Sequence, residues 1–210
     1  MKEGRSVVPP RRRSLTFGLT SRGNLYYAFA FMNLPNALTS LRIFLIPFFM
    51  FFLLVDFKGN EWAAFGVFLF ATFTDTVDGL LARRTNRITT LGQLLDPIAD
   101  KLLMTAAFIC LVGVGRVPAW MAVVIIGREV AVTGFRAIAA SKGVVIPASW
   151  PGKLKMQLET VTIALLVLGE GILGKFWVVG KIGLWLTMAI ALYSAAEYFV
   201  KHGRDIVLEK

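Results

Sequence analysis

The chain has 210 residues, of which 56% are hydrophobic and 17% are charged, and its formal net charge is +10 at pH 7. Long apolar runs exclude a soluble globular protein and predict a single helical membrane domain, with the lipid bilayer and no nucleic acid as its partner. One cysteine, Cys110, lies inside an apolar run, so an intramolecular disulfide is excluded as well.

Residues 1–31 form a basic, amphipathic N-terminal extension. Two interpretations stay open for this segment. It is either a surface helix or targeting segment, or translation begins at Met32, directly before the first apolar run. The domain itself is therefore expected to cover residues 32–210.

Six apolar segments predict six transmembrane helices, because each has about 20 residues or slightly more at a rise of about 1.5 Å per residue. The expected fold class is an all-α integral membrane protein. The predicted spans are 34–56, 61–83, 91–114, 117–141, 153–173 and 175–200.

The basic residues predict the orientation of these spans. Most of the 23 lysines and arginines fall on one side of a six-span chain. By the positive-inside rule both termini are then cytoplasmic, as expected for a multi-pass protein of the inner membrane. The opposite side carries few basic residues, namely Lys58, Arg116, Lys175 and Lys181.

The second and third spans carry four aspartates at helical spacing. Asp75 and Asp78 share one face of the second helix near its cytoplasmic end, and Asp96 and Asp100 lie one turn apart on the third. A short basic turn joins the two helices and predicts that they are antiparallel neighbours. The four carboxylates are therefore expected to meet.

A cation is expected among these carboxylates, because the uncompensated set would cost on the order of 10 kcal/mol inside a membrane. Hard oxygen ligands at this density suit Mg²⁺ or Mn²⁺, and the lack of a Cys/His cluster argues against zinc. Small residues on the same faces, Gly79, Ala82 and Gly92, leave room for metal and substrate. The alternative is a set of salt bridges to Arg83, Arg84 and Lys101.

The spacing of these residues resembles a known family. The pattern Asp75-x2-Asp78-Gly79-x2-Ala82-Arg83-x8-Gly92-x3-Asp96-x3-Asp100 matches every fixed position of the CDP-alcohol phosphatidyltransferase signature, and the resemblance covers residues 33–200. It implies six transmembrane helices around a cytoplasm-facing polar cavity that holds two divalent cations, Mg²⁺ or Mn²⁺. It also implies transfer of a phosphatidyl group from CDP-diacylglycerol to an alcohol with release of CMP, by a homodimer.

The resemblance further implies a role for each signature residue. Asp100 would be the general base that takes the proton of the acceptor hydroxyl. The residues that would hold the CDP moiety are Gly79, Ala82 and Arg83. The metal ligands would be Asp75, Asp78, Asp96 and Asp100.

A basic cluster follows in the fourth and fifth spans. Arg128 lies about 18 Å from the cytoplasmic end of its helix, where an arginine is costly and usually faces a cavity or a partner. Arg136, Lys153 and Lys155 lie nearer that end, and such a cluster predicts a phosphate site. A purely structural pairing with Glu129 is the alternative for Arg128, although one glutamate cannot balance the whole cluster.

The acceptor is therefore expected to carry a phosphate of its own. The segments "GRE" at 127–129 and "GKLK" at 152–155 resemble the branch of the family whose acceptor is sn-glycerol 3-phosphate. Two alternatives remain: the same chemistry with inositol phosphate or phosphatidylglycerol as acceptor, and, in a different class, a cation transporter that uses the aspartates as its ion site. Ion flux in liposomes without nucleotide dependence would distinguish the transporter.

The first span has three polar residues near the same cytoplasmic end, Asn36, Thr39 and Arg42. Two interpretations are equally favoured for them. The residues either contact the phosphates of the donor, or they cap the helix and snorkel to the membrane surface.

Overall fold

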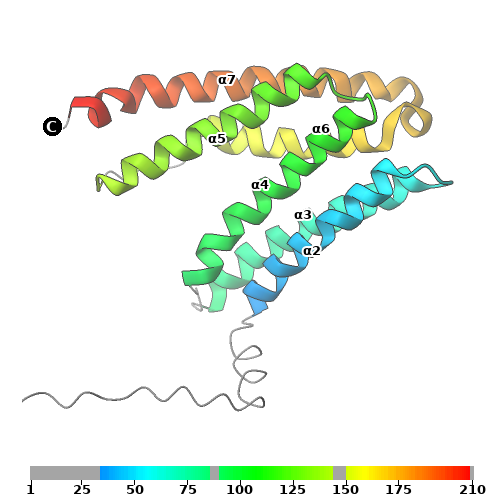
Figure 1. Ribbon diagram of the computed structural model, residues 1–210, viewed down its shortest axis with the longest axis horizontal. Coiled ribbons are helices and arrows are strands. Elements are labelled where there is room, and N and C mark those ends of the chain that lie inside the picture. The colour runs from blue at the N-terminus through cyan, green and yellow to red at the C-terminus, as the bar shows by residue number, and fades with distance from the viewer. Residues whose placement is uncertain (1–33, 86–89, 144–149, 209–210) are drawn as a thin grey trace, which may run out of the picture. The chain divides into compact units, whose positions relative to one another are not determined.

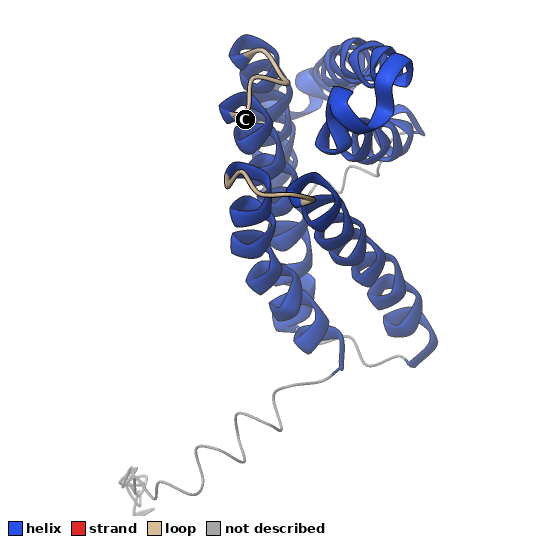
Figure 2. Ribbon diagram, turned by 90° about the vertical axis from the view of Figure 1, so that its right-hand side faces the viewer, coloured by secondary structure: helices blue, strands red, loops and turns tan. Residues whose placement is uncertain are grey.

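All six predicted apolar segments are helical. The computed structural model describes residues 34–85, 90–143 and 150–208, and the side chains of 39–74, 97–143, 152 and 154–201. Within these residues no strand occurs, and short connections join the helices (Figures 1 and 2). The elements are α2 (Leu34–Leu54), α3 (Asn60–Thr85), α4 (Thr90–Gly113), α5 (Ala119–Ser141), α6 (Trp150–Leu173), the 3₁₀ turn η1 (Gly174–Phe176) and α7 (Trp177–Leu208).

The observed helices follow the predicted bounds closely except at one end. The last helix is predicted to end at residue 200 and continues to Leu208. Hydropathy indicates where an apolar run ends, and a helix can continue beyond it. An ion pair one turn apart supports the continuation, because Lys201 Nζ lies 2.6 Å from Glu197 Oε1.

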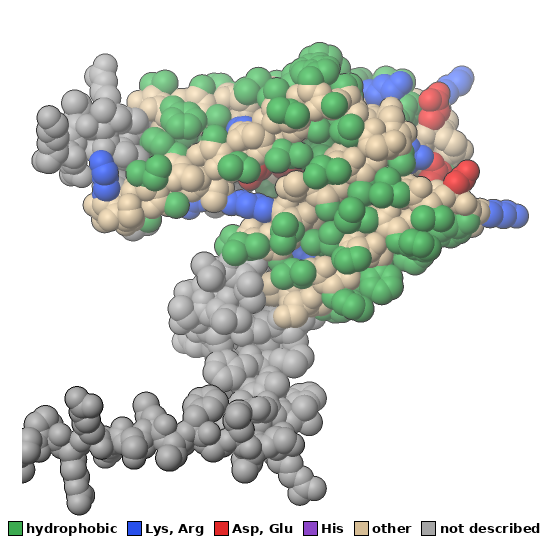
Figure 3. Space-filling model, in the orientation of Figure 1, with side chains coloured by type: hydrophobic (Ala, Val, Ile, Leu, Met, Phe, Trp, Pro, Cys, Tyr) green, Lys and Arg blue, Asp and Glu red, His purple; other side chains and the backbone are tan. Residues whose placement is uncertain are grey.

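The fold class is confirmed as all-helical, and the number of membrane crossings stays a prediction. Among the described residues, one stretch is long and apolar enough to cross a membrane, Leu154–Lys201, and a shorter apolar helix covers Thr39–Leu54. Large apolar side chains nevertheless cover much of the visible surface of the described helices (Figure 3). Phe73 is 65% exposed and Val123 70% exposed. An outer surface of this kind fits contact with lipid.

Helix α2 is the main packing partner of both α3 and α4 along their described lengths. The expected contact between the second and third spans falls on their joined ends, residues 75–96, whose side chains are not described, and it stays a prediction. Helix α4 also contacts α5 and α6, and α7 packs on both α5 and α6. In Figure 1, α4 accordingly passes from the α2–α3 pair to the group formed by α5, α6 and α7.

The apolar core lies where these helices meet. Phe49 of α2, Phe68 of α3, Phe108 of α4, Ile125 of α5 and Leu166 of α6 are all fully buried. The rings of Phe49 and Phe68 lie 5.8 Å apart between centroids, a distance at which aromatic pairs attract one another. A smaller cluster around Val132, Ala139 and Tyr198 joins the other ends of α5 and α7.

Arg116, in the connection between α4 and α5, ties three parts of the fold together. Its guanidinium pairs with Glu61 at the start of α3. It also donates hydrogen bonds to the carbonyl oxygens of Leu166 (3.1 Å) and Val167 (2.5 Å) in α6. The sequence places Arg116 only in a loop on the sparsely charged side, whereas its side chain is partly buried against α6.

Helix α6 is kinked directly beyond these carbonyls. Gly169 has φ 71° and ψ 177°, a conformation that only glycine adopts without strain. A Cβ atom at this position would lie 2.6 Å from Cζ of Arg116. The kink and the arginine therefore depend on each other.

Gly169→Ala is expected to lower the melting temperature by about 5–10 °C. The backbone strain costs about 1–3 kcal/mol, the displaced guanidinium adds to that loss, and 1 kcal/mol corresponds to about 2–4 °C in a chain of this size. Gly171→Ala is the matched control, because the nearest atom to its Cβ would be 4.0 Å away. Thermal unfolding of the purified protein in detergent measures both, and equal shifts would contradict the expectation.

Candidate active site

Polar side chains from four helices surround a cavity of about 220 Å³. The charged groups come from the first half of α4, the middle and second half of α5 and the first half of α6, and Tyr198 of α7 completes the wall. In the up-and-down order of the chain, these charged residues lie between the middle of their helices and the same end. The charged residues in the described lining are Asp100, Lys101, Arg128, Glu129, Arg136, Lys155 and Glu159.

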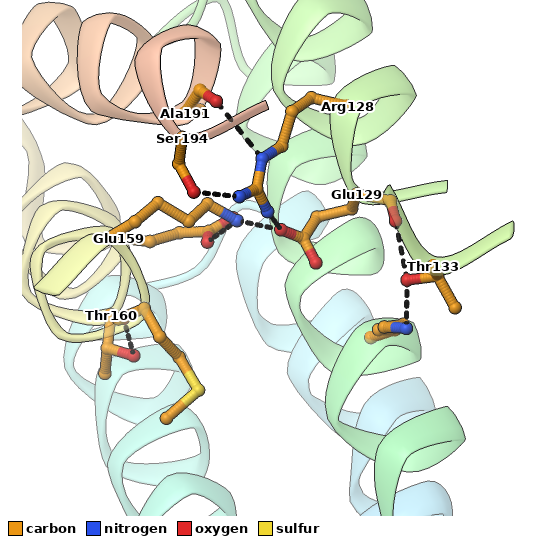
Figure 4. Close-up of polar contacts among 10 residues, drawn as sticks. Arg128, Glu129, Thr133, Glu159, Thr160, Ala191 and Ser194 are labelled. Carbon is orange, nitrogen blue, oxygen red and sulfur yellow. Dashed lines mark hydrogen bonds and ion pairs between the residues drawn. The ribbon is translucent and has the colours of Figure 1, made fainter. Parts of the chain in front are cut away.

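Arg128 is held on two sides. Its Nε donates to the carbonyl oxygen of Ala191 at 3.2 Å, and its Nη2 donates to Ser194 Oγ at 2.7 Å, both on α7. Its Nη1 donates to Glu129 Oε1 at 2.5 Å. Figure 4 shows the guanidinium between α7 and the Glu129 carboxylate. Three fixed hydrogen bonds orient this planar group within the cavity wall.

Lys155 of α6 lies between two carboxylates. Its ammonium group donates to Glu129 Oε1, the same oxygen that accepts from Arg128. It also lies 2.6 Å from Glu159 Oε2, one turn along α6. The side chains of Lys155 and Glu159 are 4% and 5% exposed, whereas that of Glu129 is 27% exposed. Burial at this level requires opposite charges to compensate each other.

A third contact joins α4 to α5 beside Asp100. Lys101 Nζ donates to Thr133 Oγ1 at 2.5 Å, and Thr133 Oγ1 donates to the carbonyl oxygen of Glu129 at 2.7 Å. This chain of hydrogen bonds places the Lys101 ammonium in the cavity wall next to Asp100. With Lys101, the described lining holds four basic side chains and three carboxylates, so its formal net charge is positive by one.

The structure brings together four of the residues singled out in the sequence. Asp100, Arg128, Arg136 and Lys155 all line the cavity. The alternative pairing of Arg128 with Glu129 is also present. The two interpretations are compatible, because the cations compensated by Glu129 still face the cavity.

Other predicted residues lie outside the described side chains. Helix α3 carries Asp75 and Asp78 one turn apart near its end, and α4 carries Asp96 one turn before Asp100, so the helical spacing expected of the acids holds in the backbone. Among the described residues, no group of three or more potential metal ligands comes together. The predicted site residues whose side chains are not described are Asn36, Asp75, Asp78, Gly79, Ala82, Arg83, Asp96 and Lys153.

Thr39 and Arg42 are buried in α2 and do not belong to the described cavity lining. Thr39 is 0% exposed and Arg42 is 1% exposed. A snorkelling side chain keeps its charged end in water, so this interpretation of Arg42 is wrong. The interpretation as contacts of the donor stays a prediction.

Sequence reasoning missed Glu159 as a cavity residue and treated Lys101 only as a salt-bridge partner. The signal for Glu159 was its position four residues after Lys155, where oppositely charged side chains meet on a helix. The signal for Lys101 was its position directly after Asp100 at the same end of the helix. Tyr198, the cavity residue of α7, carries no comparable signal in the sequence.

Comparison with known proteins gives consistent similarities. Residues 32–193 match the sequence profile of the family described as CDP-alcohol phosphatidyltransferase. The chain is 40% identical over 186 residues to a CDP-diacylglycerol–glycerol-3-phosphate 3-phosphatidyltransferase of Bacillus subtilis, an alignment that covers 81% of this chain and 95% of the relative.

Two further relatives give the same picture. A probable phosphatidylglycerophosphate synthase of Mycobacterium tuberculosis is 38% identical over 180 residues, with 83% of each chain covered. A CDP-diacylglycerol–glycerol-3-phosphate 3-phosphatidyltransferase of Rickettsia typhi is 34% identical over 169 residues, with 80% of this chain and 95% of the relative covered.

Proposed function

The chain belongs to the CDP-alcohol phosphatidyltransferase family, and from this premise we propose that it transfers the phosphatidyl group of CDP-diacylglycerol to sn-glycerol 3-phosphate. The products are phosphatidylglycerol phosphate and CMP. The observation that carries the proposal is one small cavity in which Asp100 lies together with Arg128, Arg136 and Lys155. Relatives that are named for this reaction support the same acceptor.

The cavity suits a small phosphorylated alcohol. Its volume of about 220 Å³ is below the range of about 300–1,000 Å³ typical of sites for drug-sized ligands. Arginine and lysine donors hold a phosphate group by charge-assisted hydrogen bonds. An acceptor bound by its phosphate at these cations can direct its far hydroxyl toward Asp100.

The proposed reaction is a direct displacement at phosphorus. The hydroxyl oxygen of the acceptor forms a bond to the phosphorus that carries the diacylglycerol, the bond from this phosphorus to the bridging oxygen breaks, and CMP leaves with that oxygen. Asp100 takes the proton of the hydroxyl as general base. Water has to be kept from the reacting phosphorus, because it would otherwise hydrolyse the activated lipid.

Divalent cations, Mg²⁺ or Mn²⁺, are part of the proposal. Asp75, Asp78, Asp96 and Asp100 would hold two of them, because clustered carboxylates are the ligands that these ions prefer. Such ions stabilise negative charge on a pyrophosphate and on the departing CMP. Gly79, Ala82 and Arg83 would hold the CDP moiety, with Asn36 and Thr39 near the donor phosphates.

The proposed setting is the inner membrane, with six crossings and both termini in the cytoplasm. The apolar outer surface supports this arrangement, and so does the position of the charged cavity residues between the middle and one common end of their helices. Water-soluble glycerol 3-phosphate then reaches the cavity from the cytoplasm, and the lipid donor reaches it from the bilayer. Association of two copies as a homodimer is also proposed, from the family resemblance.

An acceptor panel tests the function. With purified protein, CDP-diacylglycerol and Mg²⁺ or Mn²⁺, glycerol 3-phosphate is expected to support CMP release, and unphosphorylated glycerol at least about 100-fold less, because two or more charged hydrogen bonds are lost. Inositol phosphate and phosphatidylglycerol complete the panel. Equal rates with glycerol would contradict a phosphate site, and faster release with another acceptor would reassign the substrate.

A further inference from the structure

Glu129 is the shared partner of both buried cations in the cavity wall. Arg128 Nη1 and Lys155 Nζ donate to the same oxygen, Oε1 of Glu129. Two cations from different helices, α5 and α6, are thereby directed at a single point. A position bound by a guanidinium and an ammonium together is where a phosphate oxygen would be expected to bind.

Each cation has a second anchor that does not depend on Glu129. Arg128 is held by the carbonyl oxygen of Ala191 and by Ser194 Oγ on α7. Lys155 is held by Glu159 Oε2 on its own helix. If the Glu129 carboxylate moved away, both cations would keep their places. The N–H group that each cation had donated to Glu129 would then point at the position that Oε1 had occupied.

Glu129 differs from these anchors in its exposure. Its side chain is 27% exposed and lines the cavity, whereas that of Glu159 is 5% exposed. In Figure 4 the Glu129 carboxylate lies on the α5 side of the Arg128 guanidinium, and Glu159 lies on the other side, next to α6. The two glutamates on either side of Lys155 thus occupy different environments.

We propose that the Glu129 carboxylate is a displaceable stand-in for the phosphate of the acceptor. Without substrate, Glu129 Oε1 compensates Arg128 and Lys155, which removes the cost of two buried and unpaired charges. When a phosphorylated alcohol binds, one of its phosphate oxygens takes the place of Oε1, and the Glu129 side chain turns into the cavity opening. Glu159 stays in place and positions Lys155. The identity of the acceptor in this inference rests on the proposed function. The binding of a phosphate group at the position of Oε1 rests on the geometry alone.

The test uses inorganic phosphate as the probe, so that it does not depend on activity. Binding of inorganic phosphate to the full-length protein in detergent is measured by equilibrium dialysis. Glu129→Gln is expected to bind phosphate about tenfold more tightly, because a neutral amide competes less well for the two cations than a carboxylate. Glu159→Gln is expected to bind it about tenfold more weakly, because Lys155 loses its anchor.

The pair of variants separates displacement from simple charge. Both substitutions remove one negative charge from the same cavity, so a general electrostatic effect would tighten binding in both. That result would overturn the proposal, and so would weaker binding by Glu129→Gln. Glu129→Asp keeps the charge, but its shorter side chain cannot accept from both donors equally well. This variant is therefore expected to bind phosphate more tightly than the unchanged protein. It keeps the test decisive if Glu129→Gln does not fold.

Kinetics give a second readout in the same protein. In the CMP-release assay, Glu129→Gln is expected to lower KM for glycerol 3-phosphate with little change in KM for CDP-diacylglycerol, and Glu159→Gln to raise it. If CMP release with glycerol 3-phosphate is absent in every form while the opposite changes in phosphate binding persist, the proposed function fails and the stand-in role of Glu129 holds. Unchanged phosphate binding in both variants, with activity retained, overturns the stand-in role alone.

Discussion

Asp100→Asn is expected to lower kcat for CMP release by about 10³-fold or more. Asp100 lines the same cavity as the cations that are proposed to hold the acceptor phosphate, and the proposed mechanism has no other group that takes the hydroxyl proton. General base catalysis alone contributes about 10²–10⁴-fold. Steady-state rates with glycerol 3-phosphate and CDP-diacylglycerol measure the effect.

The control for this prediction is an aspartate at the other end of the bundle. Asp56 lies exposed in the connection between α2 and α3, so Asp56→Asn should retain the rate of the unchanged protein. Near-full CMP release by Asp100→Asn would show that this residue is not the base. Melting temperatures of both variants establish that any loss is not a failure to fold.

Arg128→Ala is expected to lower kcat/KM for glycerol 3-phosphate by about 10²–10³-fold. The substitution removes a cation directed at the proposed phosphate position, and charge-assisted hydrogen bonds contribute about 1.5–3 kcal/mol each. It also leaves Glu129 with only Lys155 of its two partners. KM for CDP-diacylglycerol should change little, because the donor is expected at the aspartate side of the site.

Two further variants show which property of Arg128 matters. Arg128→Lys keeps the charge but cannot donate to Ala191, Ser194 and a third partner from one planar group, so an intermediate loss of about tenfold is expected. Ser194→Ala removes one anchor and leaves the charge in place, and a loss of only a few-fold is expected. Equal KM values for glycerol 3-phosphate in Arg128→Ala and the unchanged protein would exclude Arg128 from the acceptor site.

Much of the fold could be predicted because apolar length is a direct physical requirement of a membrane helix. The predicted apolar runs have the length that a helix needs to cross lipid, and helices occur there. The first begins at Leu34 as predicted, and the third and fifth end at Gly113 and Leu173, within one residue of their predicted ends. The extension of α7 to Leu208 was missed, because hydropathy carries no information on a polar helix end. The same limit applies to neighbours in space: the packing of α2 against both α3 and α4 depends on side-chain fit across the bundle.

The candidate site could be predicted where charge and burial conflict. Arg128 inside an apolar run has to face a cavity or a partner, and it does both. Glu159 could not be interpreted in the same way, because its role follows from the inward direction of Lys155. The kink at Gly169 was equally hidden, since its conformation depends on Arg116, which is distant in the sequence and adjacent in space.

The contact of Arg116 at the kink also bears on the position of Lys155, because both lie along α6. Arg116 donates hydrogen bonds to the carbonyls just before Gly169, and the other end of the same helix carries Lys155. The two positions are separated by about 21 Å of helix, and a tilt of about 3° would move the ammonium group by about 1 Å. A displacement of that size costs about 10²-fold in rate when it affects reacting groups. We therefore expect turnover to be sensitive to the ion pair of Arg116 with Glu61 at the far end of the bundle, well away from any bound substrate.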